Sequence, residues 1–183
     1  MNLAIFDLDN TLLDGDSDYN WGLFLAREGF VDQKTHQAMN EKFYADYNAG
    51  KLDIYEFTEF QFQFFKNNPR KLLDKLLARY ICEVVEGMIT KNARNLVAEH
   101  RDNGDKLLII TATNSYITKP IGNLLGIDDL IGTDLEEVAG EFTGKVKGIP
   151  SFKEGKIDRL NLWLEQKELT FESFERTFFY SDS

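Results

Sequence analysis

The sequence predicts an α/β protein whose parallel sheet is interrupted, after its first strand, by a helical insertion. Two observations lead to this fold class. Short apolar runs alternate with amphipathic stretches of helical length, which is the pattern of strands joined by crossover helices. One long stretch, from Tyr19 to about Val85, shows helical periodicity and little sign of strands. The 183 residues are enough for one domain with a modest insertion.

The chain begins with a buried strand and continues into helices. Leu3–Phe6 is a short apolar run that delivers Asp7 at its end. The polar residues 14–18 predict a loop with a helix N-cap. Four amphipathic helices are expected next, separated by turn-forming residues: Trp21–Glu28, Asp32–Tyr47, Ile54–Phe65 and Arg70–Val85, with breaks at Gly29, Gly50 and Asn68–Pro69.

The middle of this helical stretch is rich in aromatic residues. Nine of the chain's 24 aromatic residues lie between Phe43 and Phe65. Because aromatic side chains dominate core burial, we expect them to form the core of the insertion. The alternative is a ligand-binding box, and both hold if the inner face of the helices covers a pocket.

The rest of the chain alternates between helices and strands. The expected elements are, in order, a helix over 92–103, a strand over 106–111, a helix over 115–125, a short strand over 130–133, a hairpin over 135–146, a helix over 153–166 and an apolar strand over 177–181. Alternation of this kind predicts a parallel sheet, with the helical stretch inserted after its first strand.

The composition narrows the class of function. Asp and Glu exceed Lys and Arg by 31 to 21, a net charge of −10, which argues against a nucleic-acid partner. The single cysteine, Cys82, cannot form an internal disulfide, and with His36 and His100 far apart no zinc site is expected. The first residues lack the basic start of a signal peptide, and no apolar run approaches the ~20 residues that span a bilayer. We expect a cytoplasmic protein that does not bind membranes.

Three predicted strands end in oxygen-bearing side chains, those of Asp7, Thr111 and Asp182. Ligands bind outside the carboxyl ends of the strands in open α/β sheets, so these side chains are expected to converge on one site. Lys156, near the start of its helix, is the basic residue best placed to join them. The alternative for this lysine is a solvated position on the helix surface.

Asp7 and Asp9 are two residues apart at the end of the first strand, a spacing that lets both face one pocket. One carboxylate can act as a nucleophile that forms an acyl-phosphate. Its neighbour can protonate the leaving alkoxide and then activate water. Carboxylates this close repel each other unless a cation lies between them, and oxygen ligands suit Mg²⁺. The alternative is that residues 9–11 merely cap a turn.

Thr111 offers a hydroxyl followed by a run of backbone N–H groups that leads into a helix. That arrangement binds a phosphate well. A simple N-cap by Thr113 or Asn114 explains the same residues equally well.

Together these residues resemble the haloacid dehalogenase (HAD) superfamily of phosphohydrolases, in its phosphoserine-phosphatase-like and histidinol-phosphatase-like branch. Four segments are similar to the family's four motifs, in order: Phe6–Leu12, Ile109–Asn114, Glu154–Lys156 and Tyr180–Ser183. The helical insertion lies between the first and second motifs, where this branch has its cap. The resemblance runs from Leu3 to Ser183.

The resemblance implies a Rossmann-like three-layer core, residues 1–15 and 87–183, with a helical cap over 16–86. It also implies Mg²⁺-dependent hydrolysis of a small phosphorylated metabolite, such as phosphoserine or histidinol phosphate. The residue roles it implies are a nucleophile and metal ligand at Asp7, a general acid/base and backbone-carbonyl metal ligand at Asp9, phosphate binding at Thr111 and Ala112, charge neutralisation at Lys156 and a further metal ligand at Asp182.

The chain departs from the family at its end, because the fourth motif stops at Ser183. We therefore expect the C-terminal part of the family fold to be missing, with an exposed apolar edge at Phe178 and Tyr180. Two alternative functions stay open: a phosphate- or metal-binding protein without turnover, and a phosphotransferase. Asp16 and Asp18 are expected to be solvated surface charges, with recognition of a substrate amine as the alternative.

Overall fold

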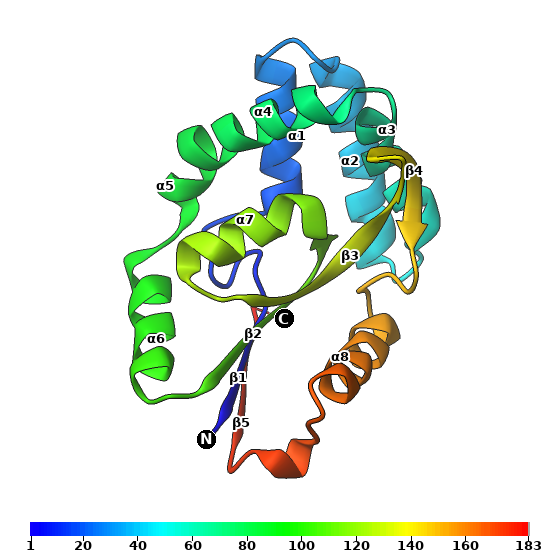
Figure 1. Cartoon of the computed structure of the whole chain (residues 1–183). Helices are drawn as coiled ribbons and strands as arrows, with labels where there is room; N and C mark the ends of the chain where they lie inside the picture. Colours follow the sequence, from blue (N-terminus) through cyan, green and yellow to red (C-terminus); the bar gives the residue numbers. More distant parts are fainter. Residues whose placement is uncertain (183) are drawn as a thin grey trace.

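The computed structural model of the chain describes residues 1–182, in which a five-stranded sheet carries helices on both faces (Figure 1). The strand order is β4-β3-β2-β1-β5, and every pairing is parallel except that of β3 with β4. The strand bounds are β1 Leu3–Phe6, β2 Lys106–Asn114, β3 Asp129–Val138, β4 Glu141–Lys147 and β5 Thr177–Tyr180. The predicted α/β fold with a mostly parallel sheet is confirmed.

Strand β1 has an unbroken apolar sequence because all four of its residues are buried. Ala4 and Phe6 belong to the apolar cluster on the face covered by α6 (Lys91–Asp102) and α7 (Ser115–Leu125). Leu3 and Ile5 pack on the opposite face against α8 (Glu154–Gln166). A strand with both faces covered has no need of polar alternation.

The helical insertion, residues 16–86, forms the upper part of the molecule in Figure 1. Its elements are α1 Ser17–Arg27, α2 Gln33–Asn48, α3 Ile54–Lys66, α4 Arg70–Tyr80, the π-helical turn η1 Ile81–Val85 and α5 Glu86–Met88. The helix expected over Arg70–Val85 therefore ends as an α-helix at Tyr80. Gly87, the first residue of the second core segment predicted from the resemblance, lies inside α5.

The insertion shares its core with the sheet. Phe65 of α3 makes edge-to-face contacts with Tyr116 of α7 and Phe142 of β4. One apolar cluster thus runs from the insertion into the main body. In the aromatic stretch 43–65, phenylalanines supply the buried members, whereas three tyrosines stay exposed: Tyr44, Tyr47 and Tyr55. The expected aromatic core is present, but the exposed tyrosines of this stretch do not belong to it.

The two segments that connect the insertion to the sheet run side by side. Leu13 and Ile89 form an isolated antiparallel bridge, and the Asp14 N–H donates to the Met88 carbonyl at 2.8 Å. Gly15 follows with a φ of +123°, which side chains disfavour. Division of the chain into a core (1–15 and 87–183) and a cap (16–86) stays a prediction.

Strand β2 continues to Asn114, three residues beyond its expected end, because β3 pairs with it as far as Thr133. Strand β3 is likewise one continuous element, where a short strand and a separate hairpin arm were expected. It turns into β4 through Ala139 and Gly140, whose φ angles of 53° and 83° suit a tight two-residue hairpin.

The expected apolar edge at β5 involves a different residue. Phe179 is 60% exposed, whereas Phe178 and Tyr180 pack against the buried ring of His100. The His100 nitrogens contact the Asp105 carboxylate at 2.7 Å and the Tyr180 hydroxyl at 2.9 Å. The expected exposure of Phe178 and Tyr180 was therefore wrong.

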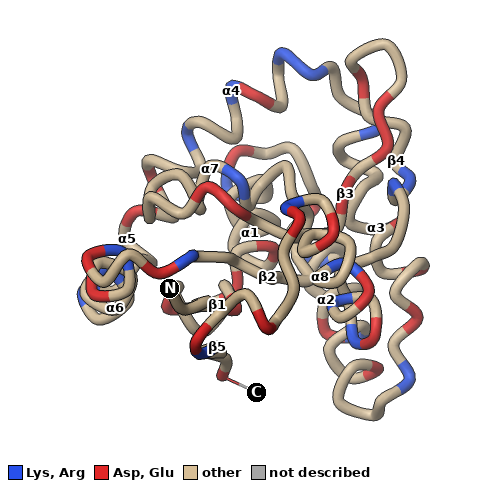
Figure 2. Tube along the Cα trace, turned by 60° about the horizontal axis from the view of Figure 1, so that its bottom comes forward, with Lys and Arg blue, Asp and Glu red and all other residues tan. Residues whose placement is uncertain are grey.

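Charge is spread along the chain. In Figure 2 the Lys and Arg positions are interspersed with Asp and Glu along the tube. No helix in residues 1–182 is long and apolar enough to cross a membrane. Ser183, the last residue of the predicted fourth motif, lies outside the described residues.

Candidate active site

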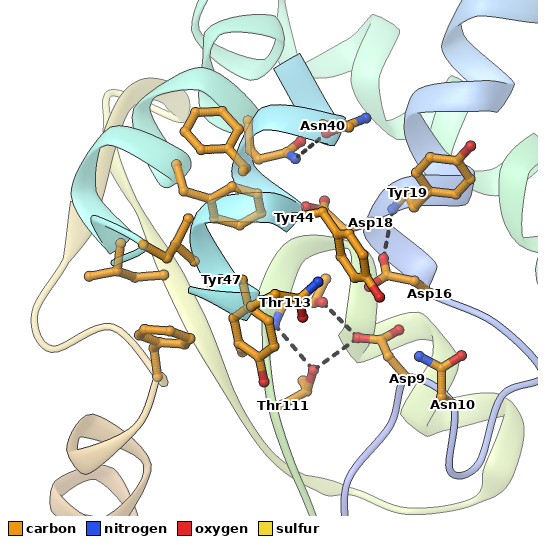
Figure 3. Close-up of a pocket in the computed structure, with 18 of the residues that line it drawn as sticks. Asp9, Asn10, Asp16, Asp18, Tyr19, Asn40, Tyr44, Tyr47, Thr111 and Thr113 are labelled. Carbon is orange, nitrogen blue, oxygen red and sulfur yellow. Dashed lines mark hydrogen bonds between the residues drawn. The ribbon is translucent and has the colours of Figure 1, made fainter. Parts of the chain in front are cut away.

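All six residues predicted for the site line one open cavity of about 1160 Å³: Asp7, Asp9, Thr111, Ala112, Lys156 and Asp182. The cavity lies at the carboxyl ends of the strands, where parallel sheets bind ligands. Its other wall belongs to the insertion, mainly to α2 and α3 (Figure 3). The structure therefore brings the predicted residues together, and their individual roles stay predictions.

Asp7 is fixed from two directions directly after β1. Its N–H donates to the Tyr180 carbonyl at 2.8 Å, which continues the sheet pairing for one residue. Its Oδ1 accepts the Leu8 N–H at 2.9 Å, and its Oδ2 lies 3.2 Å from Nζ of Lys156. One carboxylate oxygen is thus held by backbone and the other by a cation, so the side chain has a defined orientation.

Lys156 reaches Asp7 because α8 begins close to the strand ends. Gly155 permits this approach, since a Cβ at this position would lie 2.1 Å from the Pro150 carbonyl oxygen. The helix start is therefore pressed against the preceding loop, and Lys156 occupies its first turn. The alternative of a freely solvated lysine does not hold, because its side chain is 28% exposed and paired.

Asp9 is the most enclosed of the predicted carboxyl groups. Its Oδ1 accepts the Ser17 N–H at 2.6 Å, and its Oδ2 accepts the Thr113 hydroxyl at 2.8 Å. Burial raises the pKa of Asp9 to about 6, with a further increase from the charge of Asp16, against the lowering effect of the Ser17 and Thr113 hydrogen bonds. Asp9 is therefore suited to hold a proton.

Thr113 contacts Asp9, although its sequence context predicts only a helix-capping role. The cap of α7 is Asn114, whose side chain accepts the Ile117 N–H at 3.0 Å. Thr113 points to Asp9 together with Thr111, whose hydroxyl lies 3.4 Å from the same Oδ2 (Figure 3). The spacing of Thr111 and Thr113 could have predicted this contact, because residues two apart on an extended strand share a face. It was missed because β2 was expected to end at Thr111.

Replacing Thr113 by valine is expected to lower kcat about tenfold to a hundredfold, because Asp9 loses a hydrogen bond of about 1.5–3 kcal/mol that orients it. Steady-state phosphate release from an aryl phosphate measures the effect. Thr58→Val is the matched control, since the Thr58 hydroxyl bonds only to the Tyr55 carbonyl in its own helix. Equal kcat values for the two variants would contradict the assignment.

Asp16 and Asp18 are not the solvated surface charges expected from the sequence. Asp16 caps α1, accepting the Tyr19 N–H at 2.7 Å, and lines the cavity. Asp18 also lines the cavity but is 8% exposed, and its Oδ1 has no hydrogen-bond partner within residues 1–182. Burial, and then the charges of Asp16 and Asp9, raise the pKa of Asp18 well above its usual range. Both aspartates join the site.

The first turn of α1 is held in place from α4. The buried Tyr80 hydroxyl donates to the Ser17 carbonyl at 2.6 Å, and the Ser17 N–H in turn binds Asp9. A residue near the end of the insertion therefore positions the general-acid candidate at the sheet. No local sequence pattern predicts this contact, which joins residues 63 positions apart.

Oxygen donors suitable for Mg²⁺ are present at the cavity. Asp7 and Asp182 both line it, and the Asp182 N–H is anchored to the Thr11 hydroxyl at 3.1 Å. No group of three or more His, Cys, Asp or Glu in residues 1–182 has a metal-holding arrangement. Mg²⁺ commonly uses one or two carboxylates and takes its other ligands from water and substrate phosphate, so this donor set fits it.

Comparison with known proteins identifies the family. The model of the haloacid dehalogenase-like hydrolase family matches residues 4–183. The chain belongs to this family. A histidinol-phosphatase from Neisseria meningitidis serogroup C is 44% identical over all 183 residues, which cover 82% of that relative. Phosphoserine phosphatase SerB1 of Mycobacterium tuberculosis is 30% identical over 79% of the chain and 48% of its own length.

Solved structures of HAD-like proteins agree with the fold. A Bordetella pertussis protein of unknown function superimposes with a TM-score of 0.91 at 37% identity, over 97% of this chain and 80% of that one. A substrate-bound phosphoserine phosphatase gives 0.65 at 20% identity, over 97% and 76%, which supports the fold alone. The expectation of a HAD-type phosphatase is thus confirmed at the level of family and enzyme class.

Proposed function

We propose that this HAD-family chain is a Mg²⁺-dependent phosphomonoester hydrolase that forms an aspartyl-phosphate at Asp7. The observation that carries the proposal is the division of labour between two neighbouring carboxyl groups. Asp7 is held by Lys156, whereas Asp9 is buried and its pKa is raised to about 6. A nucleophile and a proton donor at the same cavity are the minimum that this chemistry requires.

The reaction has two steps. The Asp7 carboxylate attacks phosphorus, the ester P–O bond breaks, and the leaving alkoxide takes the Asp9 proton. Asp9 then takes a proton from water, whose oxygen attacks the same phosphorus, so that the acyl-phosphate P–O bond breaks and inorganic phosphate leaves. Lys156 offsets charge on the phosphoryl oxygens, and Thr111 with Ala112 binds them.

Asp7, Asp182 and the Asp9 backbone carbonyl would hold the Mg²⁺ ion. When bound, the ion supplies positive charge that offsets the repulsion between the Asp7 carboxylate and the incoming phosphate. Lys156 provides one positive charge at Asp7, against about 1.5 to 2 negative charges on a phosphomonoester near neutral pH. A second cation at this point therefore matches the charge of the site.

The proposed substrate is a small phosphorylated metabolite related to histidinol phosphate or phosphoserine. The relatives that carry these names support the class, and the acidic Asp16 and Asp18 at the cavity suit the amine that both compounds contain. The cytoplasmic location and the absence of nucleic-acid and membrane partners stay predictions.

Phosphate release tests the function. We expect release from an aryl phosphate, histidinol phosphate and phosphoserine panel with Mg²⁺ present, loss of release with EDTA, and recovery when Mg²⁺ is restored. Turnover that is unaffected by EDTA would contradict the metal requirement. Binding of phosphate without turnover of any compound would favour a phosphate-binding protein, and phosphate transfer to an added alcohol in place of water would favour a phosphotransferase.

A further inference from the structure

Carboxylates outnumber cations around the active-site cavity. Six Asp and Glu residues line it, against two lysines, Lys153 and Lys156, and no Arg or His among the lining residues that the structure describes. The whole chain also carries a net charge of −10. A phosphomonoester carries about 1.5 to 2 negative charges near neutral pH, so it approaches a cavity of its own sign. Entry of such a substrate therefore depends on the few cations at the cavity.

The two lysines differ in their partners. Nζ of Lys156 lies 3.2 Å from Oδ2 of Asp7, so the charge of Lys156 is already paired. Lys153 forms no ion pair within residues 1–182, and its Nζ lies 5.3 Å from the centre of the Phe152 ring. Phe152 in turn faces Tyr47 of α2, with 6.3 Å between the ring centres. An unpaired ammonium group therefore lies where the loop before α8 meets the insertion.

The backbone at Lys153 has a conformation that favours glycine. Residues 152–155 form a β-turn, closed by the Gly155 N–H, which donates to the Phe152 carbonyl at 2.9 Å. Lys153 is the first central residue of this turn, and its φ of 48° and ψ of −122° are those of a type II′ turn. Glycine is the usual residue there, because other side chains are strained at positive φ. The turn alone therefore gives no reason for a lysine.

Packing gives no reason for this lysine either. Lys153 is exposed, and its side chain makes no capping hydrogen bond to α8. The contact of its ammonium group with the Phe152 ring joins neighbouring residues and ties no second element to the loop. Backbone strain that neither the turn nor the packing requires is typical of functional positions.

We infer that Lys153 is a phosphate-binding residue of this cavity, whose ammonium group pairs with a phosphoryl oxygen of the entering substrate before Asp7 attacks. This inference rests on the proposed phosphatase function and adds a residue to which that function assigns no role. Lys153 offsets the repulsion between the substrate and the cavity carboxylates, whereas Lys156 stays with Asp7. The folded protein bears the strain at residue 153 with or without substrate.

Lys153→Met tests the charge, because methionine keeps a long side chain at the strained position and has no ammonium group. We expect KM for an aryl phosphate with Mg²⁺ to rise about tenfold at low ionic strength, with kcat within about twofold of the wild-type value. The rise should shrink in concentrated salt, which screens the attraction. Lys153→Arg keeps the charge and should keep KM within about threefold of the wild-type value. An unchanged KM in Lys153→Met at low ionic strength would overturn the inference.

Lys145→Met is the matched control for the loss of charge. Lys145 is an exposed lysine of β4 that forms no ion pair within residues 1–182 and does not line the cavity. Its replacement changes the net charge of the chain by the same amount, and KM should stay within about twofold of the wild-type value. A rise in KM as large as that of Lys153→Met would show that the overall charge acts, and would overturn the assignment to Lys153.

Lys153→Gly separates the strain from the charge. Glycine adopts a positive φ without strain, so we expect Tm to rise by about 2 °C while KM rises as it does in Lys153→Met. Glu168→Gly is the control, because Glu168 has a φ of 57° just after α8 and does not line the cavity. This control should leave KM unchanged. A Tm of Lys153→Gly below that of the wild-type chain would show that the lysine serves the fold, and would contradict the inference.

Binding of inorganic phosphate distinguishes failure of this inference from failure of the proposed function. Calorimetric titration of phosphate with Mg²⁺ is expected to show about tenfold weaker binding by Lys153→Met than by the wild-type chain. That result with a wild-type chain that hydrolyses no phosphate ester would refute the phosphatase and keep Lys153 as a phosphate-binding residue. Equal affinities, with a wild-type chain that hydrolyses the aryl phosphate, would refute the role of Lys153 and keep the phosphatase.

Discussion

Asp7→Asn is expected to lower Mg²⁺-dependent phosphate release by at least about a thousandfold, because removal of a covalent nucleophile costs an enzyme most of its rate enhancement. The fold should survive. An asparagine can keep the oxygen that accepts the Leu8 N–H at 2.9 Å, so that the turn after β1 retains its hydrogen bond. The variant loses the charge that faces Lys156 at 3.2 Å. Phosphate release and circular dichroism, measured on the same preparation, check both halves of the expectation.

Asp14→Asn provides the matched control for this variant. Asp14 belongs to the same segment between β1 and α1, is exposed, and does not line the cavity. Its replacement should leave kcat within about twofold of the wild-type value, as is usual for surface positions. Retained activity in Asp7→Asn, with EDTA still abolishing release, would show that the reaction does not pass through Asp7.

Asp18→Asn is expected to stabilise the unliganded protein while it weakens amine-bearing substrates. The cause is the buried charge: asparagine keeps a polar side chain but removes a negative charge that burial and the charges of Asp16 and Asp9 disfavour, a gain of at least about 1 kcal/mol. For a chain of this size 1 kcal/mol corresponds to about 2–4 °C in Tm. Thermal melts in EDTA without substrate should therefore show a rise of at least about 2 °C near pH 8. Such an exchange of stability for function is common at binding sites.

The pH dependence of this gain has a definite sign. The folded pKa of Asp18 is raised above its unfolded value of about 3.8, so the folded state binds the proton more tightly. The free energy of unfolding of the wild-type chain therefore falls as the pH rises from the unfolded to the folded pKa of Asp18. The asparagine variant has no carboxyl group to titrate at this position, so its stability does not fall for this reason. The Tm difference should be smallest near pH 4 and grow toward pH 8. A wild-type chain more stable than the variant at pH 8 would show that Asp18 has a cationic or donor partner in the unliganded protein.

The sequence predicts those parts of the fold in which the local residue pattern matches the burial that the segment has in the folded protein. Residues 3–6 of β1 and 108–111 of β2 are buried, so their apolar composition alone marks them as strands. Asp7 and Lys156 were found because motif spacing places them at strand and helix ends. Such positions change little when element boundaries shift by a few residues.

The misassigned residues depend on contacts made from elsewhere in the chain. Asp18 has the polar neighbours of a surface loop in the sequence, whereas in the structure it is buried next to Ser17, whose carbonyl accepts the Tyr80 hydroxyl from α4. The contact of Thr113 with Asp9 follows from the extension of β2 beyond Thr111, which its pairing with β3 produces. Phe178 looked exposed because nothing local shows that His100 covers it. In each case the deciding neighbour lies at least 20 residues away along the chain.

The paired connections at Leu13 and Ile89 place both ends of the insertion at one point beside the sheet. Asp9 belongs to the segment that follows β1, whereas its partner Ser17 begins α1 of the insertion. The hydrogen bond between them therefore makes the position of the general-acid candidate depend on the position of the insertion. A substitution that moves α1 relative to the sheet is expected to change proton delivery as well as substrate binding.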